Sequence, residues 1–343
     1  SEEEAAVDSF TPDSAATVQL EVAGPEAAAV EVSPLHPLDD QPRLNHVQSE
    51  GTHNSYHKWP PEGVGFEDYF YEMPPLDEQL GVHGVRQYEI DVHQDPETGE
   101  LLVYHAPLFD AETTCDTLEL CLKIMRKWSD KNPGHHALFI FIEPKDDIPP
   151  LAEFSNYQLL DEVVLDAWPR ERIIAPDDIR GDYPTLREGV LANGWPTLGE
   201  SRGKALFVIL DTGVHQAGYL ELHPNLEGAP LFVKSHVDDP FAAVLSLDNP
   251  LSSEEQIVTA VSQGFLVRTR SDTETDYIDP ERVDAALRSG AHCLSTNFPG
   301  PNETMDWYFE IPGGTPSRCN PVTAPANCTS EALEHLPEYV SDR

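Results

Sequence analysis

Histidines and acidic side chains recur where short apolar runs of the sequence come to an end. The run H-N-S-Y at 53–56 follows one such run, and Glu89 and Asp91 lie near the end of a second. A third run ends at His105 and a fourth ends at Glu143. Because the carboxyl ends of parallel strands meet at one edge of a sheet or barrel, we expect these side chains to lie close together.

The acidic residues have the spacing of a metal site. Side chains alternate along a strand, so Glu89 and Asp91 share one face and repel each other unless a cation lies between them. Glu143 and the Asn54 carbonyl, from neighbouring strands, complete an all-oxygen set. Such ligands suit Ca²⁺ or Mg²⁺ rather than zinc. The alternative is that the acids only form ion pairs, with Arg86, Lys145 or Arg268.

Two histidines can serve as acid and base. His53 and His105 follow different strands, so both imidazoles can face one reacting centre, an arrangement that suits proton transfer on a phosphodiester. His93 shares the face of Asp91 and could orient a ligand. We interpret the remaining histidines as surface or packing residues.

The elements that must hold these residues alternate between strand and helix patterns beyond residue 40. Strands are predicted at 45–49, 85–92, 101–105, 137–143, 205–211, 231–235, 243–247, 265–269 and 292–296. Helices are predicted at 76–80, 117–128, 157–168, 253–262 and 280–288. If 101–105 is a return hairpin, eight strands remain, and the pattern predicts an α/β fold. We expect a (β/α)8 barrel of the TIM type, which can be distorted. An open doubly wound sheet is the alternative, but no G-x-G-x-x-G follows the first strand.

Composition sets the domain boundaries. The 21 Lys and Arg against 61 Asp and Glu give a net charge of −40, which excludes nucleic-acid binding through a basic face and suits a salty habitat. Residues 1–40 hold ten acids and no Lys or Arg, and predict an acidic leader. We expect the catalytic barrel at 41–310 and a Pro/Cys tail packed on it at 311–343. The segment 170–203, rich in Asp, Pro and Gly, predicts an irregular insertion beside the barrel mouth.

Cysteine spacing indicates an oxidising compartment. Cys115 lies near Cys121 and Cys319 near Cys328, so two local disulfides are expected, with Cys293 free and buried. Five unpaired cysteines are the alternative.

The first ten residues lack the pattern of a signal peptide, so such a peptide has been cleaved or never existed. The longest apolar runs are too short to cross a bilayer. We expect a secreted or extracytoplasmic protein.

Taken together, H-N-S-Y, then E-I-D at 89–91, a separate His and a strand-end Glu resemble the catalytic barrel of the calcium-dependent phosphoinositide-specific phospholipases C. The likeness is greatest to the secreted, single-domain bacterial members and covers about residues 41–310. It implies that His53 and His105 are catalytic. It also implies Ca²⁺ as the cofactor, with Asn54, Glu89, Asp91 and Glu143 as its ligands.

The resemblance further implies cleavage of phosphatidylinositol, or a related phosphodiester, to diacylglycerol and an inositol cyclic phosphate. Strand-end bases could bind the phosphate, namely Lys145, Lys234, Arg268 and Arg270. An aromatic loop at 59–71 could enter a lipid surface or pack on the rim. We expect a monomer that contacts lipid peripherally.

Two other functions fit parts of the pattern. A glycerophosphodiester phosphodiesterase shares the barrel, the acids and two histidines, but that family has Arg and Gly where this chain has Asn54 and Ser55. A non-catalytic, acidic calcium-binding surface protein would explain the charge but not the two strand-end histidines.

Overall fold

The computed structural model describes residues 36–64, 69–146, 153–273, 279–301, 307–313 and 316–334. The chain divides into two units, Ser1–Glu31 and Val32–Arg343, and all the described residues belong to the second. Most of the predicted acidic leader therefore lies outside the described residues.

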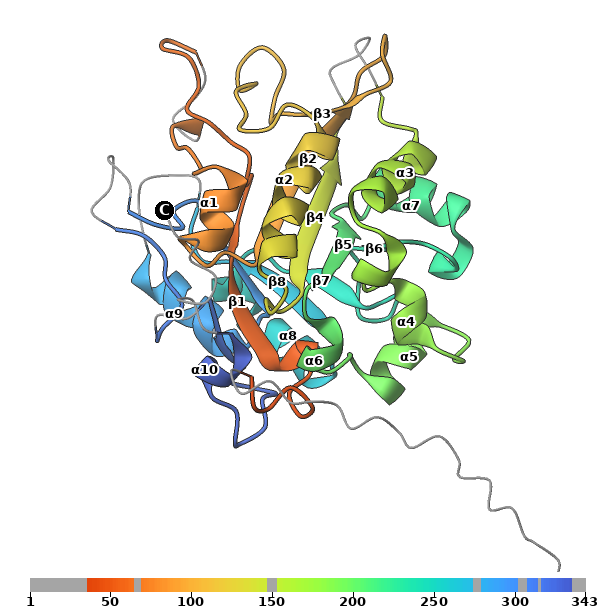
Figure 1. The fold of residues 1–343 in the computed structure, drawn as a ribbon, viewed down its shortest axis with the longest axis vertical. Helices are drawn as coiled ribbons and strands as arrows, with labels where there is room; N and C mark the ends of the chain where they lie inside the picture. The colour runs from red at the N-terminus through yellow and green to blue at the C-terminus, as the bar shows by residue number, and fades with distance from the viewer. Residues whose placement is uncertain are drawn as a thin grey trace, which may run out of the picture. The chain divides into compact units, whose positions relative to one another are not determined.

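Eight parallel strands form the centre of the second unit, in the order β6-β5-β4-β2-β1-β9-β8-β7 (Figure 1). The end strands β6 and β7 meet at a bridge between Lys234 and Val244, so the sheet forms a nearly closed barrel. The predicted (β/α)8 architecture is confirmed. The strands are β1 (Val47–Thr52), β2 (Gln87–Gln94), β3 (Leu101–Val103), β4 (Leu138–Pro144), β5 (Ala205–Ile209), β6 (Leu231–Val233), β7 (Val244–Ser246), β8 (Leu266–Arg270), β9 (Cys293–Thr296) and β10 (Ser317–Cys319).

Two short strands pair antiparallel to this barrel. β3 returns along β2, as the predicted hairpin requires, and β10 pairs with the first half of β1. All nine predicted strands are present with shifted ends, whereas β10 was not expected. The reason is that β10 is only three residues long and owes its conformation to β1, which lies far from it in sequence.

Helices follow most strands around the outside of the barrel. They are α1 (Leu76–Gly81), α2 (Leu118–Lys131), α3 (Tyr157–Ala167), α4 (Pro176–Arg180), α5 (Leu186–Asn193), α6 (Leu198–Ser201), α7 (Val214–Leu222), α8 (Pro250–Ser262), α9 (Pro280–Ser289) and α10 (Ser330–Leu333). α2 shows why they form: the Thr117 side chain caps its first turn, and Leu118, Cys121, Leu122 and Met125 recur at helical spacing on its buried face.

The insertion at 170–203 differs from its prediction in both structure and position. It contains α4, α5 and α6, and the last two begin with capping boxes, Thr185 with Glu188 and Thr197 with Glu200. Thr197 bridges Arg43, before β1, so the insertion lies at the amino ends of the strands rather than beside the mouth. It connects α3 to the start of β5, and connections from helix to strand lie at that end of a barrel.

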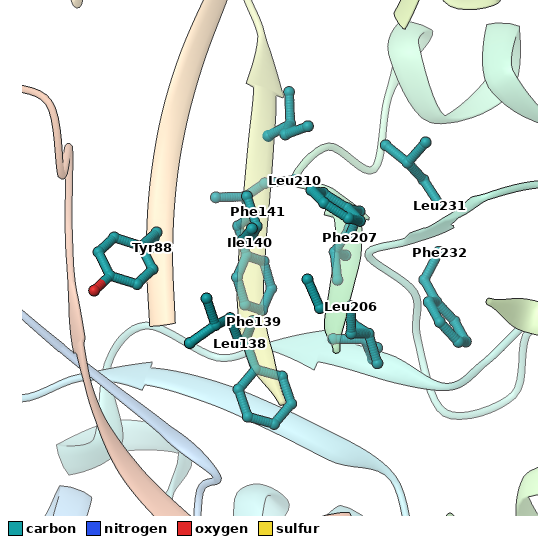
Figure 2. Packing of buried hydrophobic residues seen from close by; sticks show 14 of the residues in the cluster. Tyr88, Leu138, Phe139, Ile140, Phe141, Leu206, Phe207, Leu210, Leu231 and Phe232 are labelled. Carbon is teal, nitrogen blue, oxygen red and sulfur yellow. The ribbon is translucent and has the colours of Figure 1, made fainter. Parts of the chain in front are cut away.

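Continuous apolar strands build the core. Residues of β4, β5 and β6, among them Phe139, Phe207 and Phe232, pack side by side with no solvent exposure above about one per cent (Figure 2). Buried parallel strands read as such uninterrupted apolar runs because both of their faces are covered. The rigid core fixes the strand ends from which the polar side chains project.

The predicted disulfides are confirmed. Cys115 is bonded to Cys121 and Cys319 to Cys328, while Cys293 is free and buried. The second bond closes the segment that follows β10 and lies against Val47, at the start of β1.

Candidate active site

Three carboxylates from two adjacent strands converge toward the carboxyl end of the barrel. Glu89 and Asp91 share one face of β2, and Asp91 stands opposite Glu143 in the register between β2 and β4. Ligand oxygens of the three acids lie within 4.8 Å of one another, and Glu89 and Asp91 are buried. The structure thus brings together the three acids that the sequence grouped.

The environment of these acids disfavours their charge. Burial raises the pKa of Asp91 to about 8 and also raises that of Glu89, and the neighbouring carboxylates add to both shifts. Neither oxygen of Asp91 accepts a well-formed hydrogen bond from the described residues. Crowded carboxylate oxygens, two of the three acids being buried, are the kind that a hard divalent cation satisfies, so the residues fit Ca²⁺.

Lys145 lies at this cluster. Its Nζ is 2.7 Å from Oε1 of Glu143 and 3.2 Å from Oδ2 of Asp91. Burial by itself would lower the pKa of Lys145, but the two carboxylates outweigh it and raise the pKa above its usual value. Lys145 is therefore a permanent cation within the acidic cluster.

Arg268 forms an ion pair with Glu89, the remaining acid of the cluster. Its Nη1 lies 3.1 Å from Oδ1 of Asp248. The ion pairing considered as an alternative from the sequence is thus present for Lys145 and Arg268. Arg86 takes no part in it, because it lies before β2 and pairs with Glu334.

The hydrogen bonds of His53 determine which ring nitrogen carries the proton. Its Nδ1 lies 2.9 Å from Oδ1 of Asn297, whose amide nitrogen donates to the Thr273 carbonyl at 3.2 Å. His53 therefore donates from Nδ1, and its Nε2, 3.7 Å from Glu89, is left as an acceptor. Burial lowers the pKa of His53 well below its ordinary value, and the charges of Arg270 and Arg268 lower it further.

His105 has the opposite environment. Its Nδ1 lies 2.8 Å from Oδ2 of Asp110, a carboxylate that can only accept. Burial alone would lower the pKa of His105, but the hydrogen bond to Asp110 and the charge of Asp91 outweigh it and raise the pKa. His53 is thus kept neutral and His105 is favoured as a proton carrier. Paired groups whose pKa values are pushed apart are typical of acid and base partners.

Asn54 follows His53 in a left-handed conformation, with φ of 46°, which asparagine tolerates better than most residues. Its Nδ2 donates to the Tyr71 hydroxyl at 3.0 Å. Since that bond engages the nitrogen, the side-chain oxygen remains available as a ligand.

The other predicted bases lie around the mouth. Arg270 is buried on β8, two residues after Arg268, and its charge acts on His53. Lys234 follows β6 and lines a cavity of about 470 Å³ with Ser246 and other residues. Its charge acts on Asp248, the partner of Arg268.

His57 and Asp110 contact the site although neither was predicted to belong to it. Nε2 of His57 lies 2.7 Å from Oδ1 of Asp110, the carboxylate that also bonds His105. The interpretation of His57 as a packing residue is incomplete for this reason. The only signal in the sequence was a second histidine four residues after His53. A spacing of four residues within a loop does not predict where a side chain lies.

His93 supports the segment that carries His105. Its Nε2 lies 2.9 Å from the Tyr104 carbonyl, and the two rings stack with centroids 3.8 Å apart. It therefore contacts the residue before His105.

Comparison with known proteins places these residues in a family. The family model for the Ca²⁺-dependent phosphoinositide phospholipases C matches residues 42–104 and 100–321. The chain belongs to this family. As a family member it is a phosphodiesterase of the phospholipase C type. Comparison with curated proteins gave no match.

Solved structures of phospholipases C have the same fold. The calcium-dependent phosphoinositol-specific phospholipase C of Pseudomonas sp. is 17% identical, with a TM-score of 0.57 over 84% of this chain and 98% of that one. The Ca²⁺-dependent phosphatidylinositol-specific phospholipase C of Streptomyces antibioticus is 19% identical, with a TM-score of 0.58 over 75% of this chain and 95% of that one. The described part of this phospholipase C has no helix long and apolar enough to cross a membrane.

Proposed function

We propose that this enzyme cleaves phosphatidylinositol in a Ca²⁺-dependent reaction that yields diacylglycerol and an inositol cyclic phosphate. One observation carries the proposal. Two histidines, His53 bonded to the neutral amide of Asn297 and His105 bonded to the carboxylate of Asp110, flank a largely buried all-oxygen cluster. A similar structure, the Pseudomonas enzyme described as a myo-inositol complex, supports inositol as the head group of the substrate.

The residues that would hold Ca²⁺ are Asn54, Glu89, Asp91 and Glu143. A bound Ca²⁺ would supply positive charge that polarises the attacking hydroxyl and the phosphoryl oxygens. Lys145 and Arg268 already contact three of these ligands, so they would share the acids with the ion. Lys145, Lys234, Arg268 and Arg270 would also neutralise phosphate oxygens.

The two histidines divide the proton transfers. The inositol 2-hydroxyl oxygen forms a bond to phosphorus, and its proton passes to Nε2 of His53, the unprotonated nitrogen. The bond from phosphorus to the glycerol oxygen breaks, and Nε2 of His105 donates a proton to that oxygen. Atoms and charge balance without a further reactant, and water can later open the cyclic phosphate.

Exposed apolar side chains near the mouth support peripheral contact with lipid. Trp59 and Phe70 are each 42% exposed and stack on each other at 5.6 Å, while Leu108 and Phe109 are exposed between His105 and Asp110. Tyr71 of the same aromatic loop is buried, so only part of the loop faces outward. Phe66 lies outside the described residues.

The setting of the enzyme is also a proposal. Two disulfides favour an oxidising, extracytoplasmic compartment, and hence secretion. We also propose that the enzyme is a monomer. Its proposed parts are an acidic leader at 1–40, the catalytic barrel at 41–310 and the tail at 311–343.

The decisive assay measures release of soluble inositol phosphate from phosphatidylinositol, with and without a chelator. A second substrate replaces diacylglycerol by a phenol, which leaves without protonation. We expect His105→Ala to lose far more activity on the lipid than on the phenyl ester, and His53→Ala to lose activity on both. Equal losses for His105→Ala would remove its acid role. Turnover in excess chelator would contradict the Ca²⁺ requirement. Release of glycerol phosphate from glycerophosphodiesters would favour a glycerophosphodiesterase activity instead.

A further inference from the structure

A buried histidine lies behind the proposed acid. His57 has no exposed surface, and its ring stacks on that of Tyr71 with centroids 4.2 Å apart. Nδ1 of His57 lies 3.0 Å from the Tyr71 carbonyl oxygen, and Nε2 lies 2.7 and 2.8 Å from the two oxygens of Asp110. Both partners can only accept, so both hydrogen bonds of His57 form only when each ring nitrogen carries a proton and the ring is positively charged.

Asp110 joins this ring to His105. Its Oδ2 lies 2.8 Å from Nδ1 of His105, so one buried carboxylate accepts from two imidazoles that arise from different loops. Reciprocal backbone hydrogen bonds between Ala106 and Asp110, of 2.9 and 3.1 Å, hold the carboxylate over the turn that follows His105. The His57 and His105 rings are 6.3 Å apart. His57 therefore cannot donate directly to His105, and it acts on it through Asp110.

We propose that His57 is a positioning residue, which holds Asp110 so that His105 keeps its proton on Nδ1 and presents Nε2 to the reacting phosphodiester. The inference rests on the proposed role of His105 as acid. Without His57, one oxygen of Asp110 would be buried without a donor, and the carboxylate would be held less firmly in its orientation toward His105.

The positive ring also moderates the carboxylate. Asp110 flanked by a cationic His57 stabilises the protonated form of His105 less than an unpaired carboxylate would. The charges of Asp91 and Lys145 also act on His105, and the charge of His105 in turn lowers the pKa of His53. In the described structure, the side chains of Asp91, Lys145 and His53 make no contact with His57. Changes at His57 and Asp110 should therefore shift the titration of His105 in opposite directions.

The first test is nuclear magnetic resonance of the intact enzyme with ¹⁵N-labelled histidine rings. From the hydrogen-bonding partners, we expect a proton on both nitrogens of His57 and a proton on Nδ1 of His105. This measurement needs no variant to fold. A proton on only one nitrogen of His57, or an unprotonated Nδ1 of His105, would overturn the proposal.

The second test compares His57→Gln and Asp110→Asn. Loss of the positive ring should raise the pKa of His105 and move the alkaline limb of the kcat profile to higher pH, whereas loss of the carboxylate should move it lower. Both variants should lose about tenfold or more in kcat on phosphatidylinositol, with little change on the phenyl ester or in KM. Shifts in the same direction, or equal losses on both substrates, would show that His57 is merely structural.

A matched control separates these effects from loss of a buried histidine in general. His292 has no exposed surface, and its ring also bonds two backbone atoms, at Asn45 and Val267, at the amino end of β9. His292→Gln should lower stability but leave the pH limb in place, and a shifted limb there would overturn the proposal. If His105→Ala instead shows no preference between the substrates, the acid role fails, while the resonance signature would still support the positioning of His105.

Discussion

A buried ion pair at the amino end of the barrel offers a quantitative test of how the segment after β10 is attached. Nε of Arg86, the residue before β2, donates to Oε1 of Glu334 at 2.8 Å. The backbone nitrogen of His136, before β4, donates to the other oxygen at 3.1 Å. Arg86, His136 and Glu334 have no exposed surface. Glu334 therefore links the C-terminal described residues to two central strands through its charge.

The magnitude follows from the pKa of this carboxyl. Burial alone would raise the pKa of Glu334, but the Arg86 guanidinium outweighs burial and lowers it from 4.5 to about 2. At about 1.4 kcal/mol for each pH unit, the ionised form contributes about 3 kcal/mol to the free energy of unfolding at pH 7. Because the folded pKa is the lower one, this contribution is present above the unfolded value and is lost as the pH falls toward 2. About 1.5 kcal/mol should remain at pH 3.

Glu334→Gln removes the charge and keeps the size, so denaturant unfolding of the two proteins isolates this term. We expect the variant to be less stable by about 3 kcal/mol at pH 7 and by about half as much at pH 3. Glu331→Gln, at an exposed position of helix α10, which Glu334 directly follows, should change stability by about 0.5 kcal/mol or less. A deficit below about 1 kcal/mol at pH 7, or one that does not change with pH, would refute the reasoning.

Three further predictions concern the metal, the charge and the cross-links. Glu89→Gln should raise the Ca²⁺ concentration needed for half-maximal activity, and removal of Ca²⁺ from the unaltered enzyme should lower its Tm, because the crowded carboxylates then face one another uncompensated; an unchanged Ca²⁺ requirement would contradict the ligand set. With a net charge of −40, activity on phosphatidylinositol vesicles should rise with NaCl at fixed free Ca²⁺ as the Debye length falls from ~30 Å to ~3 Å, whereas activity on a soluble analogue should change little; highest vesicle activity at the lowest salt would contradict interface repulsion. Replacing Cys319 and Cys328 by Ser should lower the free energy of unfolding by about 2–3 kcal/mol in chemical denaturation, as expected for a short loop; a change within about 0.5 kcal/mol would show that the loop is held by its other contacts.

The sequence by itself predicted the features that short-range patterns encode. The alternation along a strand placed Glu89 and Asp91 on one face, and the turns after apolar runs placed His53 and His105 at strand ends. Local disulfides were predictable because cysteines six and nine residues apart can meet with little chain rearrangement. These inferences need only the geometry of one element or one loop.

The insertion shows where pattern reading fell short even locally. Its two T-x-x-E capping boxes were visible in the sequence, but the helices that they begin, α5 and α6, are so short that turn-forming residues dominate the composition. Its position depends on contacts such as the bridge from Arg43 to Thr197, which no local pattern contains.

Only the tertiary structure decided the chemical state of the two histidines. Asn297 is 244 residues from His53, and Glu334 is 248 residues from Arg86, so only the packing of distant segments creates these pairs. His57 and Asp110, 53 residues apart, meet because the loops after β1 and β3 pair at a bridge between His57 and Thr113. The side-chain types and their places at strand ends are local properties, but a protonation state depends on partners and burial, which exist only once distant segments have packed together.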